Sequence, residues 1–507
     1  MASNNANGRD ETDHTHPAAG EGTGHTRAQP VPVRRVIALF AGPVLMLVLL
    51  ALPSPQGLSP EAWRLAAFAA WMVVWWIGEA VPIPATALLP IPMMPLLGIG
   101  QIGAVTANYG HPLIFLFLGG FLLAAAMQRW GLHKRIALKI IRIVGTSAGG
   151  IIAGFMLATA FLSMWISNTA ATIMMFAVGL SVIEFIARKT PDRAMVRNFG
   201  VALMLSIAYS ASIGGVGTLI GSPPNALLAS YLQRSHGIPI DFFTWMQIGM
   251  PVVLVMLPVT WLMLTRVIFS VRELKIGDAA DVIRSEFAAL GPMSRGEGVV
   301  AAVFVLAALG WILRQPLADL SGLAITDTTI ALLAALLLFA WPVSREKAQF
   351  ALDWESARNI PWGVLLLFGG GLALADGFNG TGLAMWIGTQ VSGFEVSTWV
   401  LILIVTAAII YLTEITSNTA STATFLPILG AVAVGLGIDP RIIVVPVALG
   451  ASMAFMMPVA TPPNAIVFSY SGLKLGDMVK AGFWLNIIAI GVIVGEMILL
   501  APLVFGL

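Results

Sequence analysis

Long apolar stretches recur along this chain from Val36 to Leu507, and they constrain its fold more than any other feature. A helix needs about 20 apolar residues to cross a bilayer. Charged residues make up only 10% of the 507 residues, against roughly 25% in an ordinary soluble domain. The sequence therefore predicts an all-α polytopic membrane protein. The eleven predicted crossings lie at about 36–52, 61–80, 82–103, 112–130, 197–233, 243–269, 297–314, 326–343, 361–378, 441–472 and 481–505.

Two further apolar stretches, 148–187 and 397–436, are too long for one crossing, and each has a polar break in its middle. We interpret each as a re-entrant helical hairpin that enters and leaves the membrane on the same side. Eleven crossings then place the two termini on opposite sides, and 23 of the 27 Lys and Arg residues fall on the N-terminal side. Because cytoplasmic loops carry such an excess, we expect a cell-membrane protein with a cytoplasmic N-terminus and an external C-terminus.

Residues 1–33 are polar and hold almost no large apolar residue, so we expect a disordered cytoplasmic tail before a membrane domain at 34–507. The net charge of +2 offers no basic surface for nucleic acid. Cysteine is absent, which excludes disulfide scaffolds and thiolate metal sites.

The chain contains two copies of one pattern. Ser167-Asn168-Thr169 recurs as Ser417-Asn418-Thr419, 250 positions later, and Pro223-Pro224-Asn225 recurs as Pro462-Pro463-Asn464, 239 positions later. Each half has five predicted crossings, an odd number, so the halves insert upside down relative to each other. Such inverted-topology repeats are the plan of secondary transporters. The repeats cover about 61–270 and 297–507.

Polar breaks interrupt the apolar stretches at Ser167–Thr169, Gly214–Asn225, Ser417–Thr419 and Ala460–Asn464. Unpaired backbone at membrane depth is tolerated only where it lines a cavity, so we expect these broken helices to converge near the midplane. Helix N-termini there suit an anion, whereas freed carbonyls and hydroxyl oxygens suit a small cation. One such motif could simply pack helices closely, but two matching copies favour a binding site. No Lys or Arg lies inside the spans apart from their ends, so bound sodium would balance the anion.

Glu414 breaks the symmetry of the repeats, because its counterpart is Met164. An acid within the membrane could titrate and carry protons. We favour instead a structural role, in which the carboxylate accepts backbone hydrogen bonds in its own hairpin.

These motifs resemble those of the divalent anion/sodium symporter family, whose members carry dicarboxylates, citrate or sulfate. The resemblance covers roughly residues 60–507 and includes Gly217–Ser222 before the first Pro-Pro-Asn and Glu79-Ala80-Val81-Pro82. It implies a homodimer, with a scaffold and a moving transport domain in each protomer, and elevator-type alternating access. The expected transport part is mainly 148–270 and 397–507, and the expected scaffold is mainly 36–144 and 297–391.

The same resemblance implies the site residues. The first sodium site is expected at Ser163, Ser167, Asn168 and Gly221, and the second at Thr413, Thr416, Asn418 and Ala460. Thr416 stands where the family often has a small apolar residue, which a backbone-carbonyl ligand would tolerate. The dianion is expected to contact Asn168, Thr169, Ser222, Asn418, Thr419 and Thr461.

We therefore expect a transporter, not an enzyme, that imports C4-dicarboxylates such as succinate, malate or fumarate together with sodium ions. Within the family, a sulfate or citrate symporter and a dicarboxylate exchanger remain as alternatives. Some members exchange without sodium, yet this chain keeps neutral oxygen-bearing residues at both sodium positions. An intramembrane hydrolase built on Ser452 lacks a histidine to act as its base. An anion channel fits buried, convergent sites less well than alternating access does.

Overall fold

The computed structural model describes residues 33–144, 147–271, 274, 279–344, 346, 348–392 and 397–506. Nine helices in these ranges are long and apolar enough to cross a membrane, and five shorter helices are also apolar. The described chain adds one small antiparallel ribbon of strands β1 (Pro342–Ser344) and β2 (Gln349–Phe350). The prediction of an all-α polytopic membrane protein is confirmed. The predicted tail at 1–33 lies outside the described residues, except Val33, which begins helix α1.

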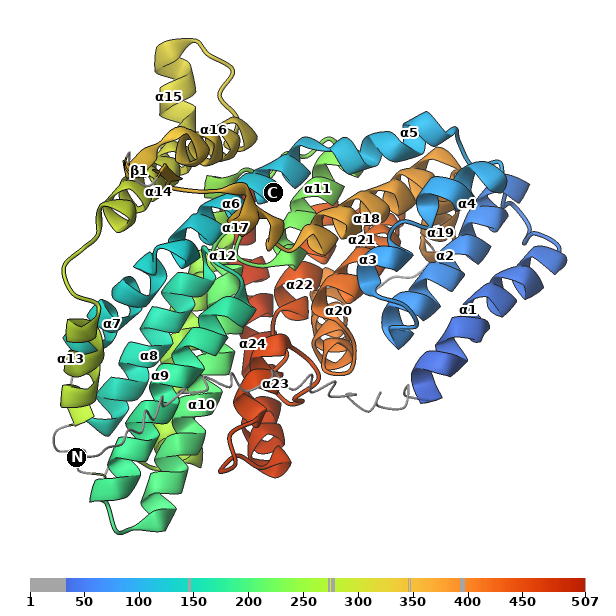
Figure 1. Cartoon of the computed structure of the whole chain (residues 1–507). Coiled ribbons are helices and arrows are strands. Elements are labelled where there is room, and N and C mark those ends of the chain that lie inside the picture. The colour runs from blue at the N-terminus through green and yellow to red at the C-terminus, as the bar shows by residue number, and fades with distance from the viewer. Residues whose placement is uncertain are drawn as a thin grey trace, which may run out of the picture.

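Helices follow one another along both halves of the chain (Figure 1). Those before residue 270 are α1 (Val33–Ala51), α2 (Pro60–Gly78), α3 (Ile83–Thr86), α4 (Pro90–Leu96), α5 (Ile102–Ala107), η1 (Asn108–Gly110), α6 (Pro112–Arg129), α7 (Leu132–Val144), α8 (Ala148–Ser163), α9 (Asn168–Lys189), α10 (Arg193–Val216), α11 (Pro223–His236), α12 (Phe242–Leu262) and the π-helical η2 (Met263–Ile268). Those after it are α13 (Ala279–Ala289), α14 (Arg295–Ile312), α15 (Arg314–Ser321), α16 (Asp327–Ala340), α17 (Trp354–Arg358), α18 (Trp362–Gly380), α19 (Leu383–Val391), α20 (Thr398–Thr413), α21 (Asn418–Gly435), α22 (Pro440–Ala451), α23 (Pro462–Phe468), α24 (Leu475–Leu499) and α25 (Ala501–Phe505).

Both predicted hairpins break where the sequence indicates. α8 and α9 flank the first break, and α20 and α21 flank the second, with the matching helix ends 250 residues apart. Ser167 and Ser417 begin the second helix of each hairpin as N-caps, since their hydroxyls accept from the N–H groups of Ala170 (3.2 Å) and Ala420 (3.5 Å). The repeated motif therefore carries its own helix-start signal.

The two remaining predicted breaks also divide long apolar stretches into two helices. α10 ends at Val216 and α11 begins at Pro223, whereas α22 ends at Ala451 and α23 begins at Pro462. Proline suits the first helical position, because its missing N–H has no partner there in any helix. The Pro-Pro pairs thus mark helix starts.

The stretch 82–103 is not one helix, contrary to the single crossing predicted there. It forms the short helices α3 and α4, and its end leads into α5. Five prolines between Pro82 and Pro95 explain the difference, because each lacks the N–H that an unbroken helix needs. Two amphipathic helices outside the predicted crossings, α7 and α13, pack against each other.

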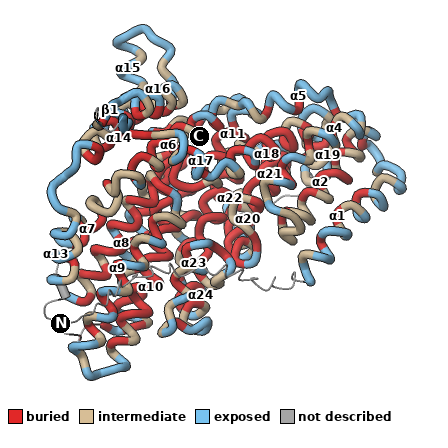
Figure 2. The backbone as a smooth tube through the Cα atoms, in the orientation of Figure 1, coloured by how far each residue is buried: buried red, intermediate tan, exposed pale blue. Residues whose placement is uncertain are grey.

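Two groups of helices can be distinguished by their contacts. α8, α9, α12 and α23 pack around α10, in which every residue from Phe199 to Val216 is buried. α6, α14 and α16 pack together in the other group, where α18 also contacts α6 and α2. Figure 2 shows the buried backbone concentrated through the middle of the molecule, with α1 and α15 largely exposed at its edges. The α8–α9 break and the end of α10 therefore belong to the first group.

Candidate functional site

A cavity of about 700 Å³ lies where the four broken segments meet. Both Ser-Asn-Thr motifs and both Pro-Pro pairs contribute to its wall. The predicted site residues on the wall are Ser167, Asn168, Thr169, Gly221, Ser222, Asn418, Thr419, Ala460 and Thr461. The three other predicted residues, Ser163, Thr413 and Thr416, are buried and do not line it. The structure thus brings all six residues predicted for the dianion to one cavity.

The residues predicted for the first cation site lie together in the first half. The Ser163 hydroxyl donates to the Asn168 side-chain oxygen and lies 2.7 Å from the Ala211 carbonyl. Gly221 is packed against backbone oxygens: a Cβ atom there would lie 2.6 Å from the Gly215 carbonyl and 3.0 Å from that of Ser163. Oxygen atoms of Ser163, Asn168 and Gly215 therefore lie close to Gly221, whereas the Ser167 hydroxyl caps α9.

The second half repeats this arrangement. The Thr413 hydroxyl donates to the Asn418 side-chain oxygen at 2.6 Å and lies 3.2 Å from the Ala451 carbonyl oxygen. The neighbouring break is held by Asn464, whose amide donates to the carbonyls of Ala454 (3.1 Å) and Met457 (3.0 Å). Its counterpart Asn225 donates to Gly215 (2.9 Å) and Thr218 (2.8 Å) in the first half. The two halves therefore have the same pattern of hydrogen bonds at these matching positions.

Thr416 differs from the other predicted ligands. Its hydroxyl bonds to the Leu412 carbonyl at 2.8 Å and to the Ser421 hydroxyl at 2.7 Å, and its side chain is away from the cavity wall. Its backbone carbonyl is therefore the oxygen that remains for the sodium ligand that the resemblance implies.

The electrostatic character of the cavity comes from dipoles and not from fixed cations. α9, α11 and α21 begin at its wall, so their N-terminal N–H groups place partial positive charge there. Among the described residues that line it, none is Lys or Arg, and Glu79 is the one charged residue. Ser222 and Ser452 join the two halves beside the wall, with their hydroxyls 3.3 Å apart.

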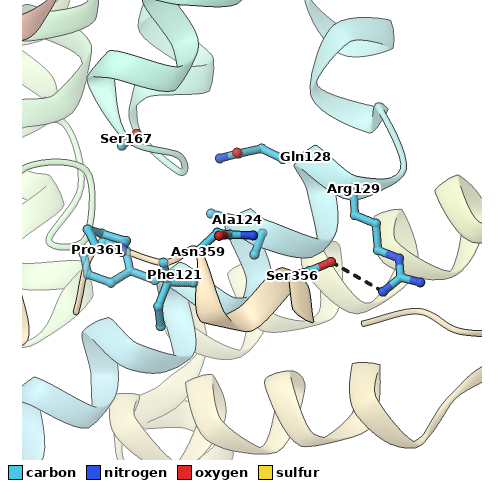
Figure 3. Close-up of a pocket in the computed structure, with 10 residues that line it drawn as sticks. Phe121, Ala124, Gln128, Arg129, Ser167, Ser356, Asn359 and Pro361 are labelled. Atoms are coloured by element: carbon cyan, nitrogen blue, oxygen red, sulfur yellow. Dashed lines mark hydrogen bonds between the residues drawn. The ribbon is translucent and has the colours of Figure 1, made fainter. Parts of the chain in front are cut away.

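The opposite wall of the cavity was missed by the sequence analysis. It is formed by Glu79, Phe121, Asn359, Pro361 and Val364. An adjoining pocket of about 280 Å³ shares Phe121, Asn359, Pro361 and Ser167 with it. In Figure 3 the Gln128 side chain extends into this pocket. The Arg129 side chain instead points to Ser356, with its guanidinium nitrogen 3.5 Å from the Ser356 hydroxyl oxygen. Arg129 also forms an ion pair with Asp353. The Glu79–Pro82 motif and the Asn-Ile-Pro sequence before α18 are the signals that could have indicated this wall.

Comparison with known proteins shows the family of this chain. A model of the "sodium:sulfate symporter transmembrane region" matches residues 33–505. A sodium-dependent dicarboxylate transporter, SdcS, of Staphylococcus saprophyticus is 43% identical over 482 residues, which cover 94% of this chain and 93% of that protein. The SdcS of Staphylococcus aureus strain USA300 is 41% identical over 489 residues, covering 95% and 94%.

A solved structure is similar in fold alone. The crystal structure of the Alcanivorax borkumensis YdaH transporter, described as having an unusual topology, aligns with a TM-score of 0.56 at 15% identity, covering 86% of this chain and 98% of that one. The family model spans nearly the whole chain, and the resemblance noted from the motifs is confirmed. The chain belongs to the sodium:sulfate symporter family, a family of membrane transporters.

Proposed function

We propose that this protein is a secondary active transporter that imports C4-dicarboxylates such as succinate, malate or fumarate together with sodium. The observation that carries this proposal is the single cavity into which both Ser-Asn-Thr motifs project. Two equivalent polar motifs suit two carboxylates, one for each motif. The names of the 41–43% identical relatives, sodium-dependent dicarboxylate transporters, support both the substrate class and the coupled ion.

The proposed dianion site consists of Asn168, Thr169, Ser222, Asn418, Thr419 and Thr461, all on the cavity wall. The proposed sodium sites lie directly behind the two asparagines, with Ser163, Ser167, Asn168 and Gly221 in one and Thr413, Thr416, Asn418 and Ala460 in the other. Removing an anion from water without a compensating charge costs several kcal/mol. Since no Lys or Arg is among the described lining residues, the sodium ions supply that compensation and so couple the two fluxes.

Ion pairs support alternating access by an elevator-type movement. α18 begins at the cavity near Val364, and about 18 Å further along it, Asp376 pairs with Arg234 at 2.8 Å. At the same end, Arg314 contacts Asp241 at 2.5 Å and Asp327 at 3.2 Å. The Arg234–Asp376 and Arg314–Asp241 pairs join the proposed transport part to the proposed scaffold away from the cavity, whereas Asp327 belongs to the scaffold itself. Movement of the transport part would break those two pairs and open that end.

The Lys and Arg distribution supports a cytoplasmic N-terminus and an external C-terminus for this multi-pass protein. In that orientation the cavity opens toward the cytoplasm, because Glu79 and Asn359 lie at cytoplasmic ends of their helices. The family resemblance supports a homodimer, which a cross-linking or mass measurement on the purified protein would test.

Uptake into liposomes tests the proposed function. Purified protein is reconstituted, and uptake of labelled succinate, sulfate and citrate is measured with and without an inward sodium gradient. We expect succinate uptake that requires sodium. Preferential uptake of sulfate or citrate would favour those symporters, and succinate uptake that needs internal succinate but no sodium would favour an exchanger.

Removing one hydroxyl from either cation site should first change the dependence on sodium. We expect Ser163→Ala and Thr413→Ala to raise the sodium concentration for half-maximal succinate uptake by roughly 10- to 100-fold, since a contact to a charged group contributes about 1.5–3 kcal/mol. Saturating sodium should partly restore succinate affinity, because coupling between two bound ligands is reciprocal. Unchanged sodium dependence with weaker succinate binding at saturating sodium would instead place these residues on the anion.

The charge of the substrate should set the pH dependence of uptake. Carboxylic acids lose their protons near pH 4 to 6, so the dianion fraction of succinate rises between about pH 5.5 and 7.5. We expect the apparent affinity for total succinate to improve over that interval. Fumarate is a stronger acid and should show a smaller change, whereas an equal change for both substrates would point to a titrating group on the protein.

A further inference from the structure

Equivalent hydrogen bonds stabilise the helix breaks in the two halves, but the halves differ at one buried position. The first half has Met164 directly after Ser163, and the second has Glu414 directly after Thr413. The Glu414 residue is only 3% exposed. Glu414 thus directly follows a residue of the proposed second sodium site, and the first half has no acid at the matching position.

The Glu414 carboxylate accepts hydrogen bonds from four N–H groups. Phe455 donates at 2.7 Å, Met456 at 2.9 and 3.0 Å, and Met457 at 3.0 Å, so three successive backbone groups wrap around it. The Asn486 amide of α24 adds a fourth at 2.7 Å. All these partners are donors, the arrangement that stabilises a carboxylate anion. The carboxylate does accept backbone hydrogen bonds as expected, but from the break after α22 and not from its own hairpin.

The equivalent segment of the first half is held without a charge. There the Thr218 hydroxyl donates to the Met164 carbonyl, and the Trp245 indole donates to the Val216 carbonyl at 2.8 Å. Neutral groups can therefore fold this kind of break, so folding alone does not require an acid. In the second half, no Lys or Arg of the described residues forms an ion pair with Glu414.

The segment that Glu414 holds, Phe455 to Met457, leads directly to Ala460 of the proposed second sodium site. Met457 accepts from the Asn464 amide and from the Ala460 N–H at 3.2 Å, so the position of the Met457 carbonyl sets that of Ala460. Given the proposed sodium coupling, we propose that Glu414 is a positioning residue for the second cation site and makes that site bind sodium more tightly than the first. Its buried charge lacks a fixed partner, and a sodium ion beside Thr413 reduces the cost of burying it.

The test compares Glu414→Gln with Met164→Gln, which places the same carboxamide at the matching position of the first half. The sodium concentration is varied in two measurements. One is the melting temperature of the purified protein without substrate, and the other is succinate uptake in liposomes. We expect Glu414→Gln to raise the half-saturating sodium concentration about tenfold or more and Met164→Gln to change it less than about threefold. A Glu414→Gln protein with a lower melting temperature but an unchanged sodium titration would overturn the proposal.

Double-mutant cycles separate this effect from a general loss of stability. The effect of Glu414→Gln on sodium binding should shrink in a Thr413→Ala background and persist in a Ser163→Ala background, because only the first pair shares a site. Equal effects in both backgrounds would contradict the assignment. If Glu414→Gln yields no folded protein, Asn486→Leu disturbs the same carboxylate from α24, and the same cycle applies with the same two outcomes.

The wild-type titration distinguishes failure of this inference from failure of the proposed function. Sodium-independent succinate uptake by the wild-type protein would remove the proposed coupling itself. Sodium-dependent wild-type uptake with an unaltered Glu414→Gln titration would remove only the role of Glu414.

Discussion

Replacing Asn168 or Asn418 with alanine should abolish sodium-driven succinate uptake while leaving folded protein in the membrane. Each asparagine starts a helix at the cavity wall, and its side-chain oxygen accepts from Ser163 or Thr413 behind that wall. We therefore expect each amide to serve the anion on one side and a cation on the other. Losing two contacts to charged ligands, at about 1.5–3 kcal/mol each, weakens binding by roughly two to four orders of magnitude.

Uptake and sodium-dependent thermal stabilisation are measured for both variants. Asn379→Ala serves as the control, because this exposed asparagine lies near the end of α18, away from the cavity. It should transport like the wild type. Near-normal uptake by Asn168→Ala would refute the assignment of both roles to that residue.

Gly221→Ala should weaken sodium binding at the first site by roughly one to two orders of magnitude, whereas the mirror change Ala460→Gly should be mild. A Cβ atom on Gly221 would lie 2.6 Å from the Gly215 carbonyl oxygen and 3.1 Å from its Cα. These are backbone atoms that cannot rotate away, and overpacking of this kind typically costs 1–3 kcal/mol. The second half already carries alanine at the matching position, so its break accommodates a Cβ atom.

The measurement is the sodium dependence of uptake together with the melting temperature of each purified variant. Gly298→Ala is a suitable control, because a Cβ there meets no atom within 4 Å and alanine favours the helix that contains it. A Gly221→Ala variant with the wild-type sodium titration would show that the backbone relaxes without consequence and that the first cation site lies elsewhere.

The motifs predicted the broken helices well because their signals are local. Ser167 and Ser417 cap the helices that follow them, and the Pro-Pro pairs begin α11 and α23. Such signals act within one turn of the chain, so they can be interpreted from a single sequence. The same locality let the duplication predict which segments would be equivalent, and the helix ends that flank the two hairpin breaks repeat at the motif offset of 250 residues.

Contacts between distant segments could not be predicted in this way. Phe121 and Asn359 complete the cavity wall, yet nothing in their local sequence marks them as neighbours of Ser167. The partners of Glu414 lie 41 to 72 residues further along the chain, so a role in its own hairpin was as reasonable from sequence as the contact observed. The sequence shows which chemical groups a residue offers, but tertiary packing decides which groups they contact.

By itself, the sequence determined that the chain is a helical membrane protein, that it is duplicated, and where its helices break. Apolar length, proline and helix-capping side chains decide those features within a few residues, because the bilayer leaves backbone groups no partner except their own helix or a cavity. The tertiary structure alone decided that the four breaks meet at one cavity, which residues form its opposite wall, and that Glu414 binds the far break. Those outcomes depend on how helices from both halves pack, and many arrangements are compatible with the same local pattern.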